Sequence, residues 1–309
     1  MKDKRIEKII LNSVNYASLS PSFEKGKIAS SYIFASDDTE LNNGLLEELL
    51  KKYFCEKPIH GKPCEECIEC IKVQNKTHID VTYFGEGDQL VKKDDIRVLL
   101  ENSITRPFET DHKFLIVKNS EKLSDVSQNL LLKTIEDLPK FVTIILLTNS
   151  LAKILPTIKS RCQIVQLIPL EKKDIITLLG SGEKFLNIAE VSDGVLGTAL
   201  KYAENADEFE QDYKFAVKIV TEYSSSAEIA ENSLYLINRK EQLEEIIKII
   251  QSVYYMALTD RISASIGKKI IAKDIKLCDK CLDMINKNVV KTMVIDYLLI
   301  NILKNKVGV

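Results

Sequence analysis

Four of the seven cysteines form the pattern C-x8-C-x2-C-x2-C, at Cys55, Cys64, Cys67 and Cys70. Two-residue spacers let a turn aim successive sulfurs at one ion, and four thiolates are a common ligand set for zinc. Gly61 and Pro63 can shape the loop that leads back to Cys55. Because four protein ligands leave no open position, we expect a structural Zn²⁺ and not a catalytic one.

The other thiols and the imidazoles do not extend this pattern. Four free or redox-active cysteines without a metal are the less economical alternative in a reducing compartment. Cys278 and Cys281 lie three residues apart on one expected helix, where we interpret them as core or surface thiols rather than half of a metal site. We interpret the three histidines as surface residues: His60, His78 and His112.

A second chemical position follows the first apolar run, in YIFASDDTELNNGLLEELL, where a nucleotide-binding fold carries GxxxxGK[ST]. The residues in place of that motif's two glycines, lysine and hydroxyl are Ser36, Leu41, Asn42 and Asn43. None of them can cradle phosphate, supply the lysine charge or hold Mg²⁺ as the motif does. Asp37 and Asp38 would repel a triphosphate, so we expect no ATP at this degenerate loop.

The third apolar run, in KFLIVKNSEKL, ends where such folds place the acidic residues for Mg²⁺ and water. This chain has Lys118 and Asn119 there. Two separate parts of one hydrolytic site are therefore missing together. The sequence predicts a nucleotidase-type fold that has lost its chemistry.

These positions need a sheet to hold them, and the first half of the chain predicts one. Five short apolar or β-branched runs are expected strands: Tyr32–Ala35, Val81–Phe84, Phe114–Val117, Val142–Thr148 and Ile164–Leu167. Helical patterns lie between them: Leu45–Tyr53, Asp94–Asn102 and Val126–Asp137, the last after Ser124 and Asp125 as caps. Alternating strands and helices predict an α/β fold with a parallel sheet.

After Pro169 the strand signals stop and the pattern becomes helical. Three short helices are expected over Glu171–Leu179, Glu183–Val191 and Gly197–Ala203, followed by longer helical patterns at Leu234–Asp260 and Lys287–Lys304. We therefore predict three domains: an α/β domain over 1–168 with a zinc module at about 53–72, a three-helix lid over 169–206, and an all-α domain over 207–309.

Charge and hydropathy narrow the function classes. With 43 Lys+Arg against 45 Asp+Glu, the net charge of −2 gives no global attraction to DNA. The zinc stretch also balances Lys57, Lys62, Lys72 and Lys76 against Glu56, Glu65, Glu66 and Glu69, so a direct nucleic-acid contact there, an alternative reading, gains little. No stretch approaches the roughly 18 apolar residues of a membrane span, and the charged start is unlike a signal peptide. We expect an intracellular protein with no membrane partner.

Several stretches, taken in order, resemble the delta-prime subunits of the bacterial DNA polymerase III clamp loader, over about residues 26–200. They are GKIASSYIF, the four-cysteine loop, HIDVTYF, IRVLLENSITRPFETDHKFLIV, SQNLLLKTIEDLP and TIILLTNSLAKILPTIKSRCQIVQL. The resemblance implies an AAA+ module with a lid, a helical collar for assembly, and a cytoplasmic bacterial protein. It implies gamma/tau and delta subunits as partners, which load the sliding clamp on primed DNA with ATP consumed by the gamma/tau-type subunits.

Within this resemblance, the tripeptide Ser160-Arg161-Cys162 implies an arginine finger. The guanidinium of Arg161 would reach the γ-phosphate at a neighbouring subunit's site, with Ser160 and Cys162 positioning it. The plainer alternative is an ordinary arginine at a helix end, in the proline-containing helical pattern LAKILPTIKS. Gly197 stands in place of the lid arginine, and Thr148 and Asn149 stand at the sensor position.

Two functions follow as hypotheses. The first is a non-hydrolysing subunit that completes a neighbour's ATP site. The alternative is an active gamma/tau-type ATPase with an atypical phosphate loop.

Overall fold

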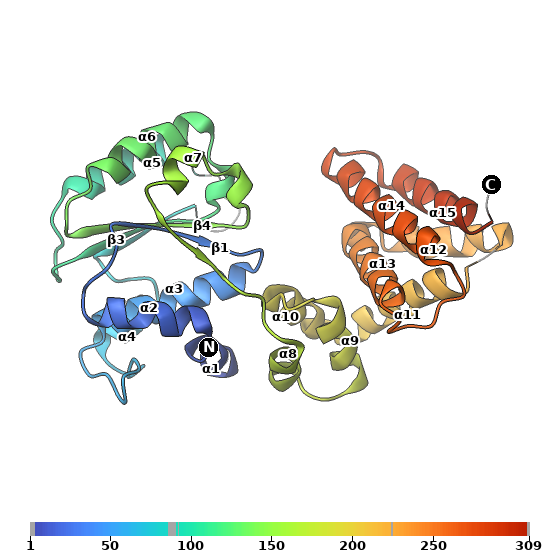
Figure 1. Ribbon diagram of the computed structural model, residues 1–309, viewed down its shortest axis with the longest axis horizontal. Helices are drawn as coiled ribbons and strands as arrows, with labels where there is room; N and C mark the ends of the chain where they lie inside the picture. The colour runs from blue at the N-terminus through green and yellow to red at the C-terminus, as the bar shows by residue number, and fades with distance from the viewer. Residues whose placement is uncertain (1–3, 86–90, 92, 224, 308–309) are drawn as a thin grey trace. The chain divides into compact units, whose positions relative to one another are not determined.

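The computed structural model describes residues 4–85, 91, 93–223 and 225–307. The chain forms two compact units (Figure 1). The sheet unit comprises Met1–Leu178 and Gly194–Thr198, and the helical unit comprises Leu179–Asp193 and Ala199–Val309. This division falls inside the segment 169–206, so the lid as a separate domain, and with it the three-domain division, stays a prediction.

A five-stranded parallel sheet in the order β2-β3-β4-β1-β5 forms the centre of the sheet unit. Its strands are β1 (Ser31–Ala35), β2 (Val81–Phe84), β3 (Lys113–Val117), β4 (Val142–Thr148) and β5 (Gln163–Gln166). The five predicted strands are thereby confirmed, with ends that differ by one residue at most. β1, β3 and β4 are buried along their whole length, which is why they are apolar runs rather than alternating patterns.

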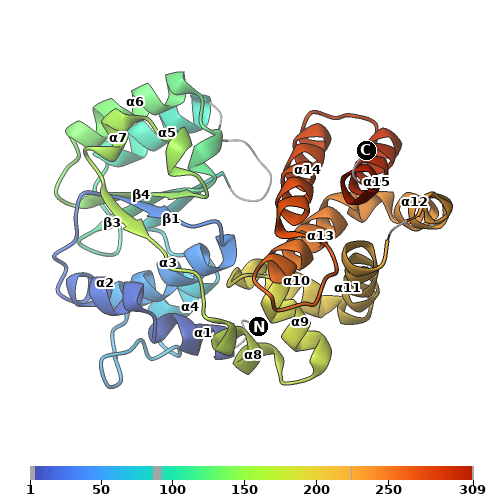
Figure 2. The ribbon, with the colours of Figure 1, turned by 45° about the vertical axis from the view of Figure 1, so that its right-hand side comes forward.

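Helices cover both faces of this sheet (Figures 1 and 2). One face carries α1 (Lys4–Leu11), α2 (Val14–Glu24), α3 (Thr39–Phe54) and α4 (Ile68–Gln74). The other carries α5 (Lys93–Ile104), α6 (Asp125–Glu136) and α7 (Pro156–Lys159). Side chains alternate along a strand, so successive residues pack into the two hydrophobic cores on opposite faces of the sheet. Tyr32 and Phe34 pack with α2 and α3, while Ile33 packs with the core under α5 and α6.

The proline-containing stretch 151–160 is not one helix, and this expectation was wrong. Leu151–Lys153 forms a single 3₁₀ turn, the chain straightens at Ile154 and Leu155, and Pro156 begins α7. Proline disfavours a helical conformation in the residue before it and lacks the N–H that a helix interior needs. At the first helical position neither property costs anything, so Pro156 starts a helix rather than kinking one.

One free edge of the sheet is β5, and a side chain from the N-terminal helices covers part of it. Asn15 Nδ2 donates to Gln166 O at 3.1 Å, and Asn15 Oδ1 accepts from Ile168 N at 3.4 Å. The amide thus makes the pair of hydrogen bonds that a neighbouring strand would make. The next element along the chain after β5 is the helix α8 (Lys172–Leu179).

The helical unit contains α9 (Glu183–Val191), α11 (Ala206–Thr221), α12 (Ile229–Asn238), α13 (Leu243–Leu258), α14 (Lys268–Asn286) and α15 (Lys291–Val307), and α10 (Leu196–Glu204) leads into it. The pattern Leu234–Asp260 is split at Arg239, whose guanidinium pairs with Glu208 and Asp212 of α11. The helix predicted over Lys287–Lys304 begins before α15 does, because a turn that contains Asn288, with φ 58°, precedes α15. No helix in the described part of the chain is long and apolar enough to cross a membrane.

Candidate functional site

The cysteine loop begins where α3 ends. Cys55 follows the last helical residue, and Cys67 is the N-cap of α4. Between them Ile59 and Lys62 exchange backbone hydrogen bonds of 2.9 Å around His60 and Gly61, whose φ angles are 50° and 74°. Two consecutive positive φ angles are typical of a tight hairpin turn, in which glycine carries no steric penalty. This turn reverses the chain towards Cys64.

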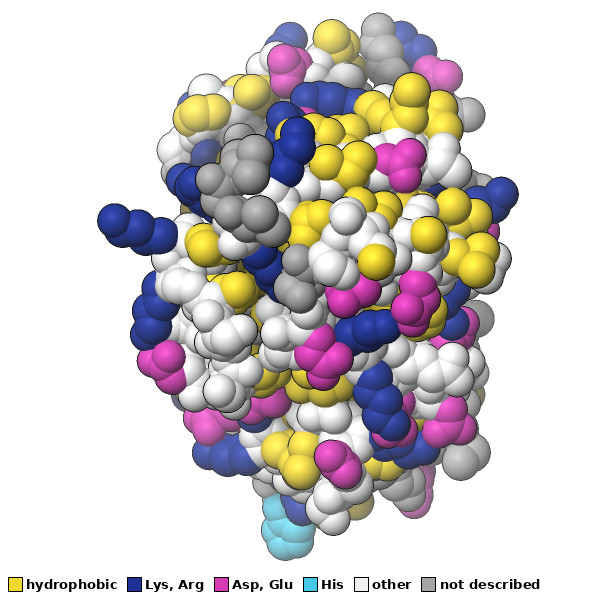
Figure 3. All heavy atoms as spheres, turned by 90° about the vertical axis from the view of Figure 1, so that its right-hand side faces the viewer, with side chains coloured by type: hydrophobic (Ala, Val, Ile, Leu, Met, Phe, Trp, Pro, Cys, Tyr) yellow, Lys and Arg dark blue, Asp and Glu magenta, His cyan; other side chains and the backbone are white. Residues whose placement is uncertain are grey.

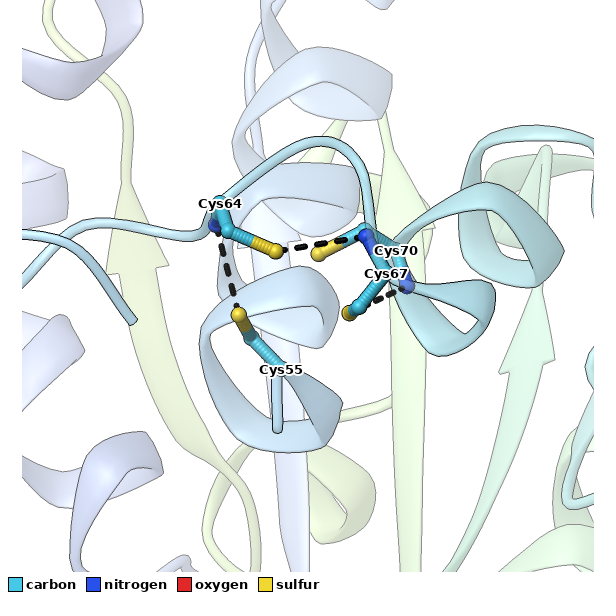
Figure 4. Close-up of side chains that lie close together, drawn as sticks. All are labelled: Cys55, Cys64, Cys67 and Cys70. Atoms are coloured by element: carbon cyan, nitrogen blue, oxygen red, sulfur yellow. Dashed lines mark hydrogen bonds between the residues drawn. The ribbon is translucent and has the colours of Figure 1, made fainter. Parts of the chain in front are cut away.

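The four sulfurs converge, so the sequence prediction of a cluster fits the structure (Figure 4). All four Sγ atoms lie within 4.8 Å of one another. Four sulfurs about 2.3 Å from one zinc ion in a tetrahedron would be about 3.8 Å apart, so the cluster can close on an ion with small side-chain movements. The described residues that form this group are all cysteines, and His60 is not among them.

Backbone N–H groups point at these sulfurs. Cys64 N donates to Cys55 Sγ and Cys67 N to Cys64 Sγ, both at 3.3 Å, and Cys70 N donates to Cys67 Sγ at 3.5 Å. The N–H groups of Glu66 and Cys67 lower the pKa of Cys64 to about 7, whereas burial raises the pKa of Cys70. Hydrogen bonds of this kind orient metal ligands. The donor set therefore fits a four-thiolate metal centre.

Polar contacts connect the loop to the rest of the sheet unit. Lys51 of α3, whose side chain is buried, lies 2.5 Å from Glu65 and 3.2 Å from Glu48. On the other side, Glu69 Oε2 lies 2.9 Å from His78 Nε2. The Lys51–Glu65 and His78–Glu69 contacts each join one residue of the loop region to a buried partner, so the loop is fixed at both flanks.

The interpretation of two histidines as surface residues was wrong. His78 is 2 % exposed and its ring lies 3.9 Å from the ring of Phe54. His112 is 9 % exposed, with Nε2 2.8 Å from Thr143 Oγ1. His78 lies beside Phe54 and His112 beside Phe114, and these aromatic rings supply the apolar surroundings that a neutral imidazole tolerates. Cys278 and Cys281, in contrast, are core thiols, one of the two predicted locations.

The start of α3, where a phosphate loop would lead into its helix, carries a buried carboxylate. Asp38 is the N-cap of α3 and accepts from Leu41 N at 3.1 Å. The same carboxylate accepts from the backbone N–H groups of Leu196 and of Gly197, the latter at 3.3 Å. Burial raises the pKa of Asp38, while these N–H groups act in the opposite direction. The helix N-terminus that would face a phosphate therefore already faces an anion of this chain.

A polar pocket of about 380 Å³ opens beside this position. It lies at the carboxyl ends of β1, β3 and β4, and Ser36, Asn42, Asn43, Lys118, Asn119, Glu121, Thr148 and Asn149 line it. Leu41, the remaining residue of the degenerate loop, is buried in the core instead. Lys118 Nζ lies 5.3 Å from the centre of the Tyr83 ring.

The two expected sensor residues bond to a carboxylate that sequence reasoning missed. Glu121 Oε2 lies 3.3 Å from both Thr148 Oγ1 and Asn149 N, each of which donates to it. Glu121 is 8 % exposed. The contact joins the ends of β3 and β4, so these residues have a structural partner within the chain.

Arg161 lies at the amino ends of the strands, whereas the pocket lies at their carboxyl ends. Arg161 precedes the amino end of β5, and its carbonyl accepts a hydrogen bond from Ser31 Oγ, at the amino end of β1, over 3.0 Å. The pocket lies at the carboxyl ends of β1, β3 and β4 in the same parallel sheet. The guanidinium of Arg161 is 2.7 Å from Glu136 Oε1, and both side chains are 41 % exposed. Ser160 and the partly buried Cys162 flank Arg161 in the sequence, and the structure does not bring Arg161 near the pocket.

A parallel sheet between two helical layers, with a polar pocket at its carboxyl edge, is the general plan of nucleotide-binding α/β domains. A family profile described as DNA polymerase III, delta subunit, matches residues 12–171. The chain belongs to this family of DNA polymerase III clamp-loader subunits.

Individual relatives include both delta-prime and gamma subunits. The chain is 30 % identical over 165 residues to DNA polymerase III subunit gamma of Buchnera aphidicola subsp. Baizongia pistaciae, covering 53 % of this chain and 44 % of the relative. It is 29 % identical over 175 residues to subunit delta' of Bacillus subtilis, covering 55 % and 49 %. The chain thus spans about half the length of these relatives.

Among solved structures, a DNA polymerase III gamma subunit-related protein of Thermotoga maritima gives a TM-score of 0.49 at 16 % identity, over 94 % of this chain and 99 % of that one.

Besides Glu121, the capping role of Asp38 and the contact made by Glu136 were missed from the sequence. Asp38 was interpreted as repelling phosphate, and its capping role could have been read from an acidic residue directly before a helical pattern. Glu136 had no signal, because only the folded chain brings the end of α6 to Arg161.

Proposed function

We propose that this chain is a non-hydrolysing, delta-prime-type subunit of the clamp loader. It assembles with gamma/tau and delta subunits to place the sliding clamp on primed DNA, and the gamma/tau-type subunits consume the ATP. Its own contribution is Arg161, donated in trans to the ATP site of a neighbouring subunit. The metal centre is a structural Zn²⁺ held by the four cysteines.

The observation that carries this proposal is the buried carboxylate of Asp38. A triphosphate bound at the start of α3 would place its negative charge beside this carboxylate, which already accepts the N–H groups of Leu41, Leu196 and Gly197. Phosphate binding there needs free N–H donors and a positive charge. The residue at the lysine position, Asn42, donates to Ser36 O and carries no charge.

The position of Arg161 supports a role in trans. The guanidinium lies at the amino edge of the sheet, whereas the pocket lies at the carboxyl edge. An arginine finger acts only where its guanidinium touches the transferred phosphoryl group. A half-exposed guanidinium on the far edge from this chain's own pocket is therefore available to a second subunit and not to its own site.

Assembly is attributed to the helical unit. Hydrophobic side chains gather on one of its faces (Figure 3). α12 and α15 pack together, and large hydrophobic residues of both remain exposed: Leu234, Ile237, Met293 and Ile300. Such surface on a folded unit is typical of protein–protein contact.

One finding favours the alternative, an active gamma/tau-type ATPase. The gamma subunit quoted above is as similar in sequence as the delta-prime subunit. Similarity over the shared fold does not distinguish the two, however, and the residues at the phosphate position favour the non-hydrolysing role.

Two measurements test the proposal. Equilibrium binding of a labelled ATP analogue with Mg²⁺ to the isolated chain is expected to show no saturation, and saturable binding in the micromolar range would support the ATPase. In a loader assembled from this chain with gamma/tau and delta subunits, Arg161→Ala is expected to lower clamp- and DNA-stimulated ATP hydrolysis. An unchanged rate in a fully assembled complex would contradict the arginine finger.

A further inference from the structure

The guanidinium of Arg161 contacts several groups of its own chain, among them the carboxylate of Glu136. Arg161 Nη2 lies 2.7 Å from Glu136 Oε1, a distance typical of a charge-assisted contact. Arg161 Nη1 also donates to Thr157 O at 3.1 Å and to Ser160 Oγ at 3.3 Å. Two of the three guanidinium nitrogens are therefore held by this chain. Among the described residues, Nε has no hydrogen-bond partner, so it remains available to a ligand.

The position of Glu136 has no explanation in the stability of its own helix. It is the last residue of α6, where the partial negative charge of the helix end disfavours a carboxylate. α6 and α7 pack side by side over the core that includes Leu131, Ile135 and Ile158. This packing brings the carboxylate to the end of α7, where Arg161 follows. Glu136 thus has a defined partner and a rigid base.

We infer that Glu136 is a positioning residue for Arg161, an inference that rests on the function proposed above. A free arginine side chain loses up to about 2 kcal/mol of rotamer entropy when it is fixed. Part of that ordering is already present here, because Glu136 and Thr157 hold the guanidinium before a neighbour is bound. The finger then presents its Nε edge to the neighbouring phosphate without a further search.

The inference predicts a specific kinetic pattern in the assembled loader. Glu136→Ala is expected to lower the kcat of stimulated ATP hydrolysis by about three- to tenfold. A loss of this size corresponds to part of the free energy needed to fix a free arginine side chain. The KM for ATP should stay unchanged, because the nucleotide-binding groups belong to the neighbour. Asp94→Ala, which removes an exposed ion pair of similar length with Arg97, serves as the matched control and should leave kcat unchanged.

A double-mutant cycle separates positioning from general structural support. If Glu136 acts through Arg161, Glu136→Ala should have no further effect in the Arg161→Ala background, since residues that act as a unit are not additive. Assembly of each variant is checked by gel filtration. A loss of equal size in both backgrounds, or a kcat that rises in Glu136→Ala, would overturn the inference.

The two proposals fail in different ways. If Arg161→Ala lowers hydrolysis and Glu136→Ala does not, the finger stands and the positioning role is wrong. If Arg161→Ala itself has no effect, the proposed finger is wrong and the role of Glu136 falls with it.

Discussion

The backbone N–H of Gly197 donates to the carboxylate of Asp38 over 3.3 Å, 159 residues along the chain. The contact joins the first residues of α10 to the first residues of α3. It occurs at the position where the family resemblance implies an arginine in the ATP-using subunits. A side chain of the protein thus connects the two segments that a nucleotide would contact.

Removal of this carboxylate should loosen both helix starts. Asp38→Ala removes an N-cap, worth about 1 kcal/mol, and leaves the buried N–H groups of Leu196 and Gly197 without their acceptor. We expect a stability loss of about 2–4 kcal/mol and faster hydrogen exchange at both amides. Asp37→Ala, at the exposed neighbouring residue, is the control. Unchanged exchange at Leu196 and Gly197 would show that the carboxylate is not what holds them.

The cysteine cluster should contain one metal ion per chain. Elemental analysis of the purified protein is expected to find about one zinc per chain, and Cys67→Ser should lose most of it because a four-thiolate site needs all its ligands. Cys162→Ser, outside the cluster, should keep the metal. Four titratable thiols in the native, metal-free protein, with no change on adding Zn²⁺, would argue against the site.

The exposed hydrophobic residues of the helical unit should matter for assembly and not for folding. Leu234 and Met293 are 59 % and 63 % exposed, so Leu234→Glu and Met293→Glu should leave the thermal unfolding of the isolated chain unchanged. Buried in an interface, either charge should weaken association with gamma/tau and delta subunits by about tenfold or more. Lys214→Glu, an exposed charge change in the same unit, is the control for analytical ultracentrifugation. Equal assembly of all three variants would place the contact elsewhere.

His112 should make stability depend on pH. Burial lowers its pKa to about 4, whereas the unfolded chain has a value near 6.5. Between these values the unfolded state binds the proton and the folded state does not, so stability is highest above about pH 6.5 and falls as the pH drops. From pH 7 to pH 5 the contribution should fall by about 2 kcal/mol.

His112→Gln can still bond to Thr143 but does not titrate, so it provides the comparison. Urea unfolding at both pH values should show a smaller loss for His112→Gln than for the wild type. Parallel pH dependence of the two proteins would exclude His112 as the source.

Local sequence patterns predicted those parts of the fold that depend on residues close together in the sequence. The five strands were found because each is a short apolar run, and the cysteine cluster because its spacing is short. The predicted helix across Pro156 failed because a periodic apolar pattern does not show where proline begins a new element. The break at Arg239 was not predicted either, and the partners of its guanidinium, Glu208 and Asp212, lie on another helix.

The candidate site shows the same difference. Arg161 could be named from the family resemblance of the stretch around it, but its carboxylate partner is 25 residues away and carries no local signal. His78 and His112 were misplaced because polar residue type alone suggests exposure, whereas the aromatic surroundings that bury them come from separate elements.

The amide of Asn15 on the edge of β5 has a consequence for the order of synthesis. Its partners, Gln166 and Ile168, leave the ribosome about 150 residues later, so the two N-terminal helices wait for most of the sheet unit before this contact can form. Until then, the part of the edge that Asn15 covers does not exist, and afterwards the amide occupies two of its hydrogen-bonding groups from within the same chain. The N-terminal segment therefore helps to complete the last strand of the sheet, which limits the time during which that strand could pair with another nascent chain.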